Sequence, residues 1–219
     1  MENNTAVLER TRKASSTRLG YRIAKRAMDI LLAGVGTVIA APFILLIILA
    51  IKLDSKGPAF YVHNRIGKNG KPLRLYKFRS MYINADQLFQ QFTPEQKAEW
   101  QENFKLREDP RITRVGSFLR RSSLDELPQL LNILQGNLSV VGPRPVVAEE
   151  LEKYGPNKER FLSVTPGLTG YWQAFTRSDG TYEDRMAMEL YYVDHANLWW
   201  DIKIILATVG SVLKGRGAR

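Results

Sequence analysis

The sequence contains no cysteine and only two histidines, His63 and His195, which are far apart along the chain. Disulfide bonds and thiolate metal sites are therefore excluded. With so few imidazole ligands, a zinc or copper site is not expected either. The absence of cysteine is typical of a protein that faces the reducing cytosol.

Acidic residues are the minority among the charged ones: 22 Asp and Glu stand against 32 Lys and Arg, which gives a formal net charge of +10. Such an excess indicates an acidic partner, such as nucleic acid, an anionic membrane surface or a phosphorylated substrate. The sequence shows no nucleic-acid-binding motif, and its basic residues do not form one continuous block. We therefore expect no nucleic-acid partner and favour a membrane and phosphorylated substrates.

Charge is also absent from one long run, because no charged residue occurs from Ile30 to Ile51. At about 1.5 Å per helical residue, this run is long enough to cross a hydrocarbon core of about 30 Å. One interpretation is an ordinary transmembrane helix. A second is a signal peptide cleaved after Val38-Ile39-Ala40, although the run continues for a turn or two beyond that point, which a cleaved leader would not need.

Two features of this run favour a re-entrant hairpin instead. Pro42 follows Ala41 near the middle, where a proline removes a helix hydrogen bond and kinks the chain. Both flanks are basic, with Arg22, Lys25 and Arg26 on one side and Lys52, Lys56 and Arg65 on the other. Because cytoplasmic flanks carry the excess of Lys and Arg, both ends are expected on the cytoplasmic side, with a membrane break at Ala41 and Pro42.

We expect three parts: a flexible basic tail over 1–20, a re-entrant membrane anchor over 21–56, and a cytosol-facing catalytic domain over 57–219. The fold class is α/β, mostly helical, with a small β-hairpin and interfacial amphipathic helices around a compact domain. Asn69-Gly70 predicts the hairpin turn between strands near 59–62 and 73–76. Helices are expected over 84–106, 129–134, 147–154, 182–193 and 198–213. Trp199 and Trp200 begin the last helix, which suits either a membrane surface or ordinary core packing.

Asp125 and Glu126 are the sharpest candidates for chemistry. Neighbours on a helix point about 100° apart, so the two carboxylates are expected to have separate roles rather than to share a proton. Ser123-Leu124-Asp125-Glu126 is also a capping-box pattern, in which Ser123 and Glu126 would close the start of a helix. The residue types alone therefore allow both a catalytic role and a helix-capping role.

Several cations favour the catalytic interpretation. Arg120 and Arg121 precede the carboxylates, Arg144 lies between Pro143 and Pro145, and Lys77, Arg79 and Arg177 lie elsewhere in the chain. Guanidinium groups bind phosphate through paired donors, and lysine acts as a point charge. Breaking a bond between two phosphates requires such neutralisation. Each cation taken singly is also compatible with a solvated surface position.

These residues form part of an ordered series of blocks that resembles the monotopic phosphoglycosyl transferases, also called the bacterial sugar transferase family. The blocks are Lys25–Asp29, Ala41–Pro42, Asn64–Gly67, Tyr76–Met81, Leu119–Leu130, Ser139–Pro145, Pro166–Gly170 and Tyr191–Val193. Each block alone is weakly specific, whereas the ordered set is highly specific. The resemblance extends from about Ala24 to about Leu213.

The resemblance implies transfer of a sugar-1-phosphate from a UDP-sugar to a polyprenol phosphate, such as undecaprenyl phosphate, with release of UMP. By the same resemblance Asp125 is the nucleophile that carries the sugar-phosphate, and Glu126 positions groups or handles a proton. Mg²⁺ is the implied cofactor, with Asp125 as its carboxylate ligand. The reaction would initiate exopolysaccharide, O-antigen or other glycoconjugate synthesis at the cytoplasmic face of the bacterial inner membrane. The implied substrate-binding residues are Lys77, Arg120, Pro143, Arg144, Pro145, Arg177 and Glu189.

The sequence departs from the family pattern near Arg177, whose neighbours differ, and at Glu189, where aspartate is common. Both changes leave the identity of the sugar open, and the oligomeric state is equally open. The chain offers no additional membrane helices, so it resembles the minimal catalytic form and not a polytopic enzyme for the same overall reaction. A basic, membrane-tethered binding module without catalysis is the alternative from another functional class.

Overall fold

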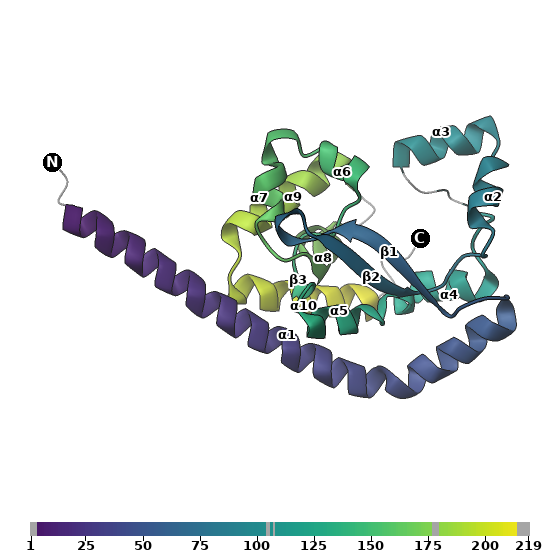
Figure 1. Cartoon of the computed structure of the whole chain (residues 1–219), viewed down its shortest axis with the longest axis horizontal. Helices are drawn as coiled ribbons and strands as arrows, with labels where there is room; N and C mark the ends of the chain where they lie inside the picture. The colour runs from purple at the N-terminus through teal and green to yellow at the C-terminus, as the bar shows by residue number, and fades with distance from the viewer. Residues whose placement is uncertain (1–3, 104–105, 107, 177–179, 214–219) are drawn as a thin grey trace.

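The computed structural model describes residues 4–103, 106, 108–176 and 180–213 of the 219-residue chain. It is mostly helical, with a long apolar N-terminal helix and two small two-stranded sheets (Figure 1). The described elements begin and end with a helix, and the hairpin follows the first helix. This arrangement confirms the mostly helical fold expected from the sequence.

The first helix, α1, runs from Asn4 to Asp54 without interruption, and Pro42 lies inside it. Two expectations are thereby corrected. Helix replaces the flexible tail, because neither glycine nor proline occurs between Asn4 and Leu19 to interrupt it. The predicted break at Ala41 and Pro42 is absorbed within one continuous helix, which Figure 1 shows turning back up toward the hairpin in its C-terminal part.

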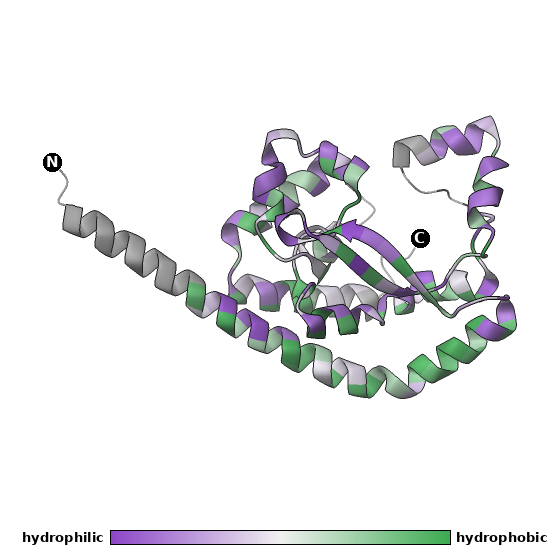
Figure 2. Ribbon diagram, viewed as in Figure 1, coloured by the Kyte–Doolittle hydropathy of each residue, from purple (hydrophilic) through white to green (hydrophobic). Residues whose placement is uncertain are grey.

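The portion of α1 from Leu19 to Asp54 is long and apolar enough to cross a membrane, judged by length and composition. Figure 2 shows its C-terminal half as an almost continuous hydrophobic band. Large apolar side chains on either side of the proline are exposed, among them Val38 at 76% and Leu46 at 63%. Water does not favour so much contiguous apolar surface, which is typical of a lipid-facing helix.

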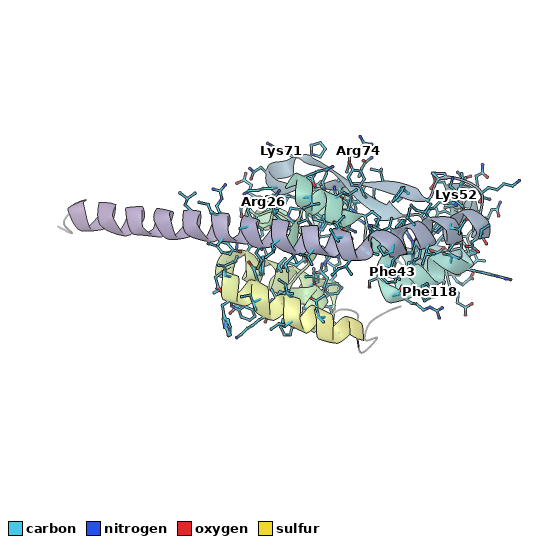
Figure 3. All side chains as sticks on the ribbon, turned by 90° about the horizontal axis from the view of Figure 1, so that it is seen from below. Arg26, Phe43, Lys52, Lys71, Arg74 and Phe118 are labelled. Atoms are coloured by element: carbon cyan, nitrogen blue, oxygen red, sulfur yellow. The ribbon has the colours of Figure 1, made fainter. Side chains whose placement is uncertain are left out.

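Both arms of α1 pack against the rest of the protein. Before Pro42, Ala33 is fully buried in a cluster with Leu75 and Ile133. After Pro42, Ile47 and Ile51 are buried in a second cluster with Phe78 and Leu119. Figure 3 shows α1 crossing the whole base of the domain, with α10 alongside it. The two arms therefore meet the domain on the same side.

The predicted hairpin is confirmed. Strand β1 (Phe60–Ile66) pairs antiparallel with β2 (Pro72–Phe78), and Phe60 lies opposite Phe78. The turn η1 (Lys68–Gly70) contains Asn69 at φ 56° and Gly70 at φ 75°, the left-handed conformations that an Asn-Gly pair adopts readily. Lys77 is the penultimate residue of β2 and lies opposite Tyr61 of β1.

The remaining elements are mostly short. They are α2 (Ala85–Gln90), α3 (Pro94–Asn103), α4 (Arg114–Ser122), η2 (Leu124–Glu126), α5 (Gln129–Gln135), β3 (Ser139–Val141), α6 (Ala148–Glu152), η3 (Gly155–Asn157), α7 (Lys158–Leu162), β4 (Gly167–Thr169), α8 (Tyr171–Phe175), α9 (Tyr182–His195) and α10 (Leu198–Leu213). Four of the predicted helices are confirmed with small shifts in their bounds, whereas the described part of the region 84–106 contains two separate helices, Ala85–Gln90 and Pro94–Asn103. Gly136 closes α5 in a left-handed conformation, as its sequence position indicated.

Strands β3 and β4 form a small parallel pair that the sequence did not predict. Ser139 lies opposite Gly167, and Val141 opposite Thr169. The two backbones approach so closely beyond this pair that a Cβ atom on Gly167 would collide with the backbone nitrogen of Gly142. Only glycine permits that approach.

Candidate active site

The turn that carries the two candidate carboxylates begins at Ser123. This residue has φ 57° and ψ 17°, and its N–H donates to backbone oxygens at the end of α4. Its hydroxyl makes no capping hydrogen bond to η2, so the capping-box interpretation of Ser123 and Glu126 is wrong. The physical reason is that Ser123 closes the preceding helix in a left-handed conformation, whereas an N-cap residue needs an extended one.

Asp125 is buried, with 9% of its surface exposed. Its neighbours Leu124 and Leu127 pack against the cluster that contains Ile47 and Ile51 of α1. Burial raises the pKa of the Asp125 carboxyl and Glu126 raises it further, while Lys77 opposes the shift. Among the described residues, no side chain donates a hydrogen bond to this carboxylate or forms an ion pair with it.

Glu126 is in a different environment. Lys77 Nζ donates to Glu126 Oε1 over 2.7 Å. Although burial alone would raise it, the pKa of Glu126 lies below its ordinary value because Lys77 and Arg144 favour the charged form. The adjacent carboxylates are thus driven in opposite directions, which agrees with the expectation that they have separate roles.

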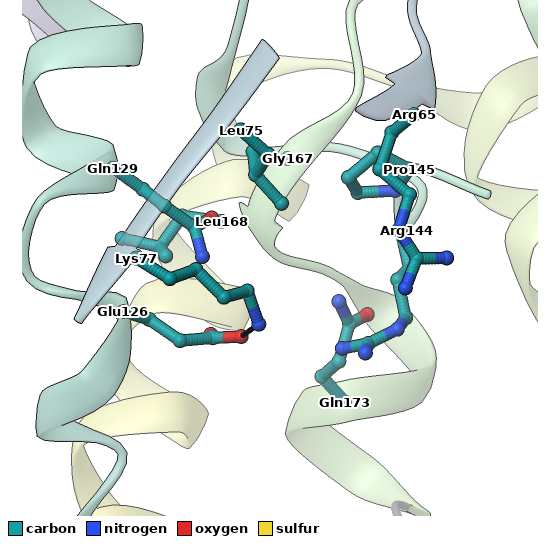
Figure 4. Close-up of a pocket in the computed structure, with 10 residues that line it drawn as sticks. All are labelled: Arg65, Leu75, Lys77, Glu126, Gln129, Arg144, Pro145, Gly167, Leu168 and Gln173. Carbon is teal, nitrogen blue, oxygen red and sulfur yellow. Dashed lines mark hydrogen bonds and ion pairs between the residues drawn. The ribbon is translucent and has the colours of Figure 1, made fainter. Parts of the chain in front are cut away.

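Lys77 and Glu126 form one wall of an open pocket, shown in Figure 4. The opposite wall carries the guanidinium groups of Arg65 and Arg144. The residues that line the pocket are Arg65, Leu75, Lys77, Glu126, Gln129, Arg144, Pro145, Gly167, Leu168 and Gln173. Three cations and one paired carboxylate therefore face a common space, which is a setting for an anionic ligand.

Arg65 is a site residue that the sequence argument did not select. A backbone hydrogen bond of 2.9 Å from Ile66 to Val146 brings the end of β1 beside the Pro143–Pro145 segment. Burial lowers the pKa of Arg65 to about 10, and the positive charge of Arg144 contributes to that shift. Sequence analysis could have found Arg65 through its place in the Asn64–Gly67 block. Sequence spacing does not show, however, that Arg65 lies close to Arg144.

Arg120 is a further cation near Asp125. Its Nε donates to Ser80 Oγ over 2.8 Å, and its charge favours the ionised form of Asp125. Arg79 has a different role: its guanidinium donates to the backbone oxygens of Ser55 and Lys56 and so fastens the end of α1. Arg79 is therefore a structural cation and lies outside the pocket lining.

The other predicted substrate-binding residues fall into three groups. Pro145 lines the pocket, and the buried Pro143 accepts a backbone hydrogen bond of 2.9 Å from Gly167. Glu189 is 1% exposed and lies behind the pocket, where it accepts a hydrogen bond from the backbone nitrogen of Arg144. Arg177 lies outside the described residues.

His63 lies near the same cations. Burial lowers its pKa to about 4, and Arg65, Lys77 and Arg144 contribute in the same direction. Its imidazole is therefore neutral at physiological pH. Asp125, by contrast, is a buried carboxylate that forms no ion pair with another described residue, and burial raises its pKa.

Within the described parts of the chain, no three His, Cys, Asp or Glu side chains gather into a metal-binding cluster. Mg²⁺ does not need one, because it commonly takes one or two carboxylates, several waters and substrate phosphate oxygens. Asp125 is not itself a lining residue of the pocket, but it directly precedes Glu126, which is. Its buried carboxylate is unpaired among the described residues, which suits that kind of ligation. The residues present are thus compatible with the magnesium that the resemblance implies.

A family model described as bacterial sugar transferase matches residues 20–215. The chain belongs to this family. The resemblance seen in the sequence blocks is thereby confirmed. Asp125, Glu126, Lys77, Arg120 and Arg144 all lie within the matched region.

Individual members of the family show the same similarity. The chain is 44% identical over 199 residues to the exopolysaccharide production protein ExoY of Sinorhizobium fredii, an alignment that covers 90% of this chain and 88% of that protein. It is 43% identical over 200 residues to the undecaprenyl-phosphate galactose phosphotransferase of Salmonella typhimurium, covering 90% and 42%. It is 39% identical over 197 residues to the UDP-glucose:undecaprenyl-phosphate glucose-1-phosphate transferase of Escherichia coli, covering 86% and 40%. The chain thus spans less than half the length of several relatives.

Proposed function

We propose that this chain transfers a sugar-1-phosphate from a UDP-sugar to a polyprenol phosphate and releases UMP, with Asp125 as the covalent nucleophile. The observation that carries the proposal is the contrast between two neighbouring carboxylates: Glu126 is held by Lys77, whereas Asp125 is buried and unpaired beside a cationic pocket. The names of the Salmonella and Escherichia coli relatives support the substrate class.

In the first step, a carboxylate oxygen of Asp125 attacks the phosphorus that bears the sugar. The new bond is an acyl phosphate, and the bond that breaks joins this phosphorus to the bridging oxygen of the diphosphate. UMP leaves with that oxygen and the negative charge. Arg65, Arg144 and Lys77 lie where such charge would be neutralised, since all three line the pocket.

In the second step, an oxygen of the polyprenol phosphate attacks the same phosphorus. The bond to Asp125 breaks, the carboxylate is regenerated, and a polyprenyl diphosphate sugar is released. Splitting one displacement into two allows a single site to serve two large substrates in turn. The hydrogen bond between Lys77 and Glu126 holds the lysine next to the turn that carries Asp125.

Mg²⁺ is the cofactor we propose, with Asp125 as its protein carboxylate ligand. When bound, it would neutralise phosphate charge and polarise the bond that breaks. The part played by the chain itself is to supply one unpaired carboxylate and leave the remaining positions to water and phosphate.

We further propose that α1 enters one leaflet of the cytoplasmic membrane and returns to the same side. In support, Ala33 before Pro42 and Ile47 and Ile51 after it are buried against the same domain. The side chains that do not contact the domain are exposed and apolar. Exposed Trp199 and Leu206 on α10, which lies alongside α1, suit the headgroup region of the same leaflet.

The deciding experiment measures UMP release by the full chain in bilayer nanodiscs, with a panel of UDP-sugars, Mg²⁺ and polyprenol phosphate. We expect release with at least one sugar, ping-pong kinetics, and a sugar-phosphate adduct on the Asp125 peptide when the acceptor is omitted. Asp125→Asn should abolish both release and adduct. Absence of turnover by the wild type with every sugar would favour the binding module, and an adduct on another residue would refute the assignment of Asp125.

A further inference from the structure

Behind the pocket, a series of hydrogen bonds and ion pairs connects the backbone of Arg144 with the guanidinium group of Arg65. The Arg144 backbone nitrogen donates to Glu189 Oε1 over 3.2 Å, and Arg185 Nε donates to the same oxygen over 3.3 Å. Arg185 Nη1 lies 3.8 Å from Glu150 Oε1, and Arg65 Nη1 donates to Glu150 Oε2 over 3.2 Å. Arg144 and Arg65 are thus the two ends of one series.

The middle of this series is buried. Exposure is 7% for Arg185, 9% for Glu150 and 1% for Glu189. The Arg185 guanidinium also lies over two aromatic rings, 5.5 Å from the centre of Trp172 and 5.2 Å from that of Tyr182. Buried charges persist only when each is paired and hydrogen-bonded, so the geometry of such a series is strongly constrained.

Glu189 is the most constrained member. Besides Arg144 and Arg185, it accepts a hydrogen bond from the hydroxyl of Tyr154. The Tyr154 ring is itself fixed against Phe161, with 4.1 Å between ring centres. Three donors from three different segments therefore determine where the carboxylate lies, and through it the backbone of Arg144.

We infer that Glu189 is a positioning residue that sets the separation of Arg144 and Arg65 for the two phosphoryl groups of a nucleoside diphosphate. The inference rests on the proposed function, whose substrate is a diphosphate. Glu150 pairs with both Arg65 and Arg185, and Glu189 pairs with Arg185. Arg144 contacts Glu189 through its backbone nitrogen, so its guanidinium is left to line the pocket. Glu189 acts through the arginines and does not contact the substrate.

The charge-removing substitution Glu189→Gln has a specific consequence. Arg185 loses its nearest negative partner and then competes with Arg65 for Glu150. We expect KM for the UDP-sugar to rise roughly tenfold while kcat changes by less than about threefold, because the altered contacts hold the bound nucleotide and not the reacting carboxylate. The Kd for UDP alone, measured by calorimetry on the full chain in nanodiscs, should rise by the same factor.

A second variant guards against misfolding. Tyr154→Phe retains the ring against Phe161 and removes only the hydroxyl that holds Glu189. It should raise the Kd for UDP in the same direction, by roughly threefold. The matched control is Asp201→Asn, because Asp201 is also a buried carboxylate with a tyrosine and a cation as partners, Tyr192 at 2.6 Å and Lys25 at 3.0 Å. Asp201 lies on α10, outside the pocket lining, so UDP binding should not change.

A double-mutant cycle distinguishes positioning from general stabilisation. In an Arg144→Ala background, Glu189→Gln should have much less effect on the Kd for UDP, because the guanidinium that Glu189 orients is gone. Equal effects in both backgrounds, or an Asp201→Asn loss as large as that of Glu189→Gln, would overturn the inference. If the wild type neither binds UDP nor releases UMP, the proposed function fails and this inference fails with it. If the wild type does both while Glu189→Gln is unchanged, only the inference fails.

Discussion

The hydrogen bond of 2.7 Å from Lys77 Nζ to Glu126 Oε1 ties the second strand of the hairpin to the turn that carries Asp125. On the other side of that turn, Leu124 and Leu127 pack with Ile47 and Ile51 of α1. Asp125 is therefore held between the hairpin and the apolar helix. Its position depends on both, which makes the Lys77–Glu126 contact a sensitive point.

Replacing Lys77 with methionine should lower kcat for UMP release by about a hundredfold or more, since the site loses a cation that stabilises developing phosphate charge. Lys71→Met is the matched control: Lys71 lies on the same hairpin but is exposed and outside the pocket lining. Its rate should stay within about twofold of the wild type. Equal losses in the two variants would mean that net charge, and not the position of Lys77, determines the rate.

Asp125→Asn and Glu126→Gln should shift the melting temperature in opposite directions at neutral pH. Burial raises the pKa of Asp125, so its charged form is disfavoured in the folded state, and this unfavourable contribution appears as the pH rises above the ordinary Asp range. Removing the charge should stabilise the fold while abolishing activity.

For Glu126 the sign is reversed. Although burial opposes them, Lys77 and Arg144 hold its pKa below the ordinary value, so its charge stabilises the fold at neutral pH. That contribution is lost as the pH falls through the lowered pKa. Glu126→Gln should therefore lower the melting temperature, by about 2–4 °C for each kcal/mol in a chain of this size. Calorimetry at pH 7 should show opposite shifts, and shifts of the same sign would contradict the assigned environments.

The acid side of the pH–rate profile should belong to Asp125. Because burial raises the pKa of this carboxyl, kcat/KM should begin to fall at a higher pH than an ordinary aspartate would give. Burial and neighbouring cations lower the pKa of His63 to about 4, so this imidazole gains its proton only well below the pH at which an ordinary histidine does. His63→Asn should accordingly leave the acid limb in place. A limb that moves with that substitution would assign the titration to the histidine.

The course of α1 can be tested directly, because the chain has no cysteine of its own. Arg22→Cys and Lys56→Cys, one at a time, place a thiol at an exposed position on either side of the apolar stretch. Both should react with a membrane-impermeant maleimide only from the cytoplasmic side, and Val38→Cys should be protected. Labelling of the two flanks from opposite sides would establish a spanning helix.

Much of the fold follows from local signals in the sequence. Asn69-Gly70 predicted the hairpin turn, Gly136 the end of α5, and apolar periodicity the helices α9 and α10. Each of these depends on a few adjacent residues. At these positions the local conformational preference agrees with the tertiary structure, so the sequence alone is sufficient to predict the element.

The features that the sequence could not predict depend on contacts between distant segments. Ser123 was predicted to cap the start of a helix, but it takes a left-handed conformation that closes α4, a helix whose Gly116 lies close to the distant backbone of Ser80. Arg65 and Arg144 meet only because β1 forms a bridge to Val146. In each case the deciding partner lies far away in the chain.

The close approach of Gly142 and Gly167 has a consequence for altering sugar preference. Since any side chain at Gly167 would strike the backbone of Gly142, this part of the pocket cannot be reshaped by substitution without moving β3 away from β4. Variation has to come from other lining residues, such as Gln129 and Gln173, whose side chains lie on different sides of the pocket (Figure 4). A library directed at those two positions, with both glycines held constant, is the economical way to search for new donor sugars.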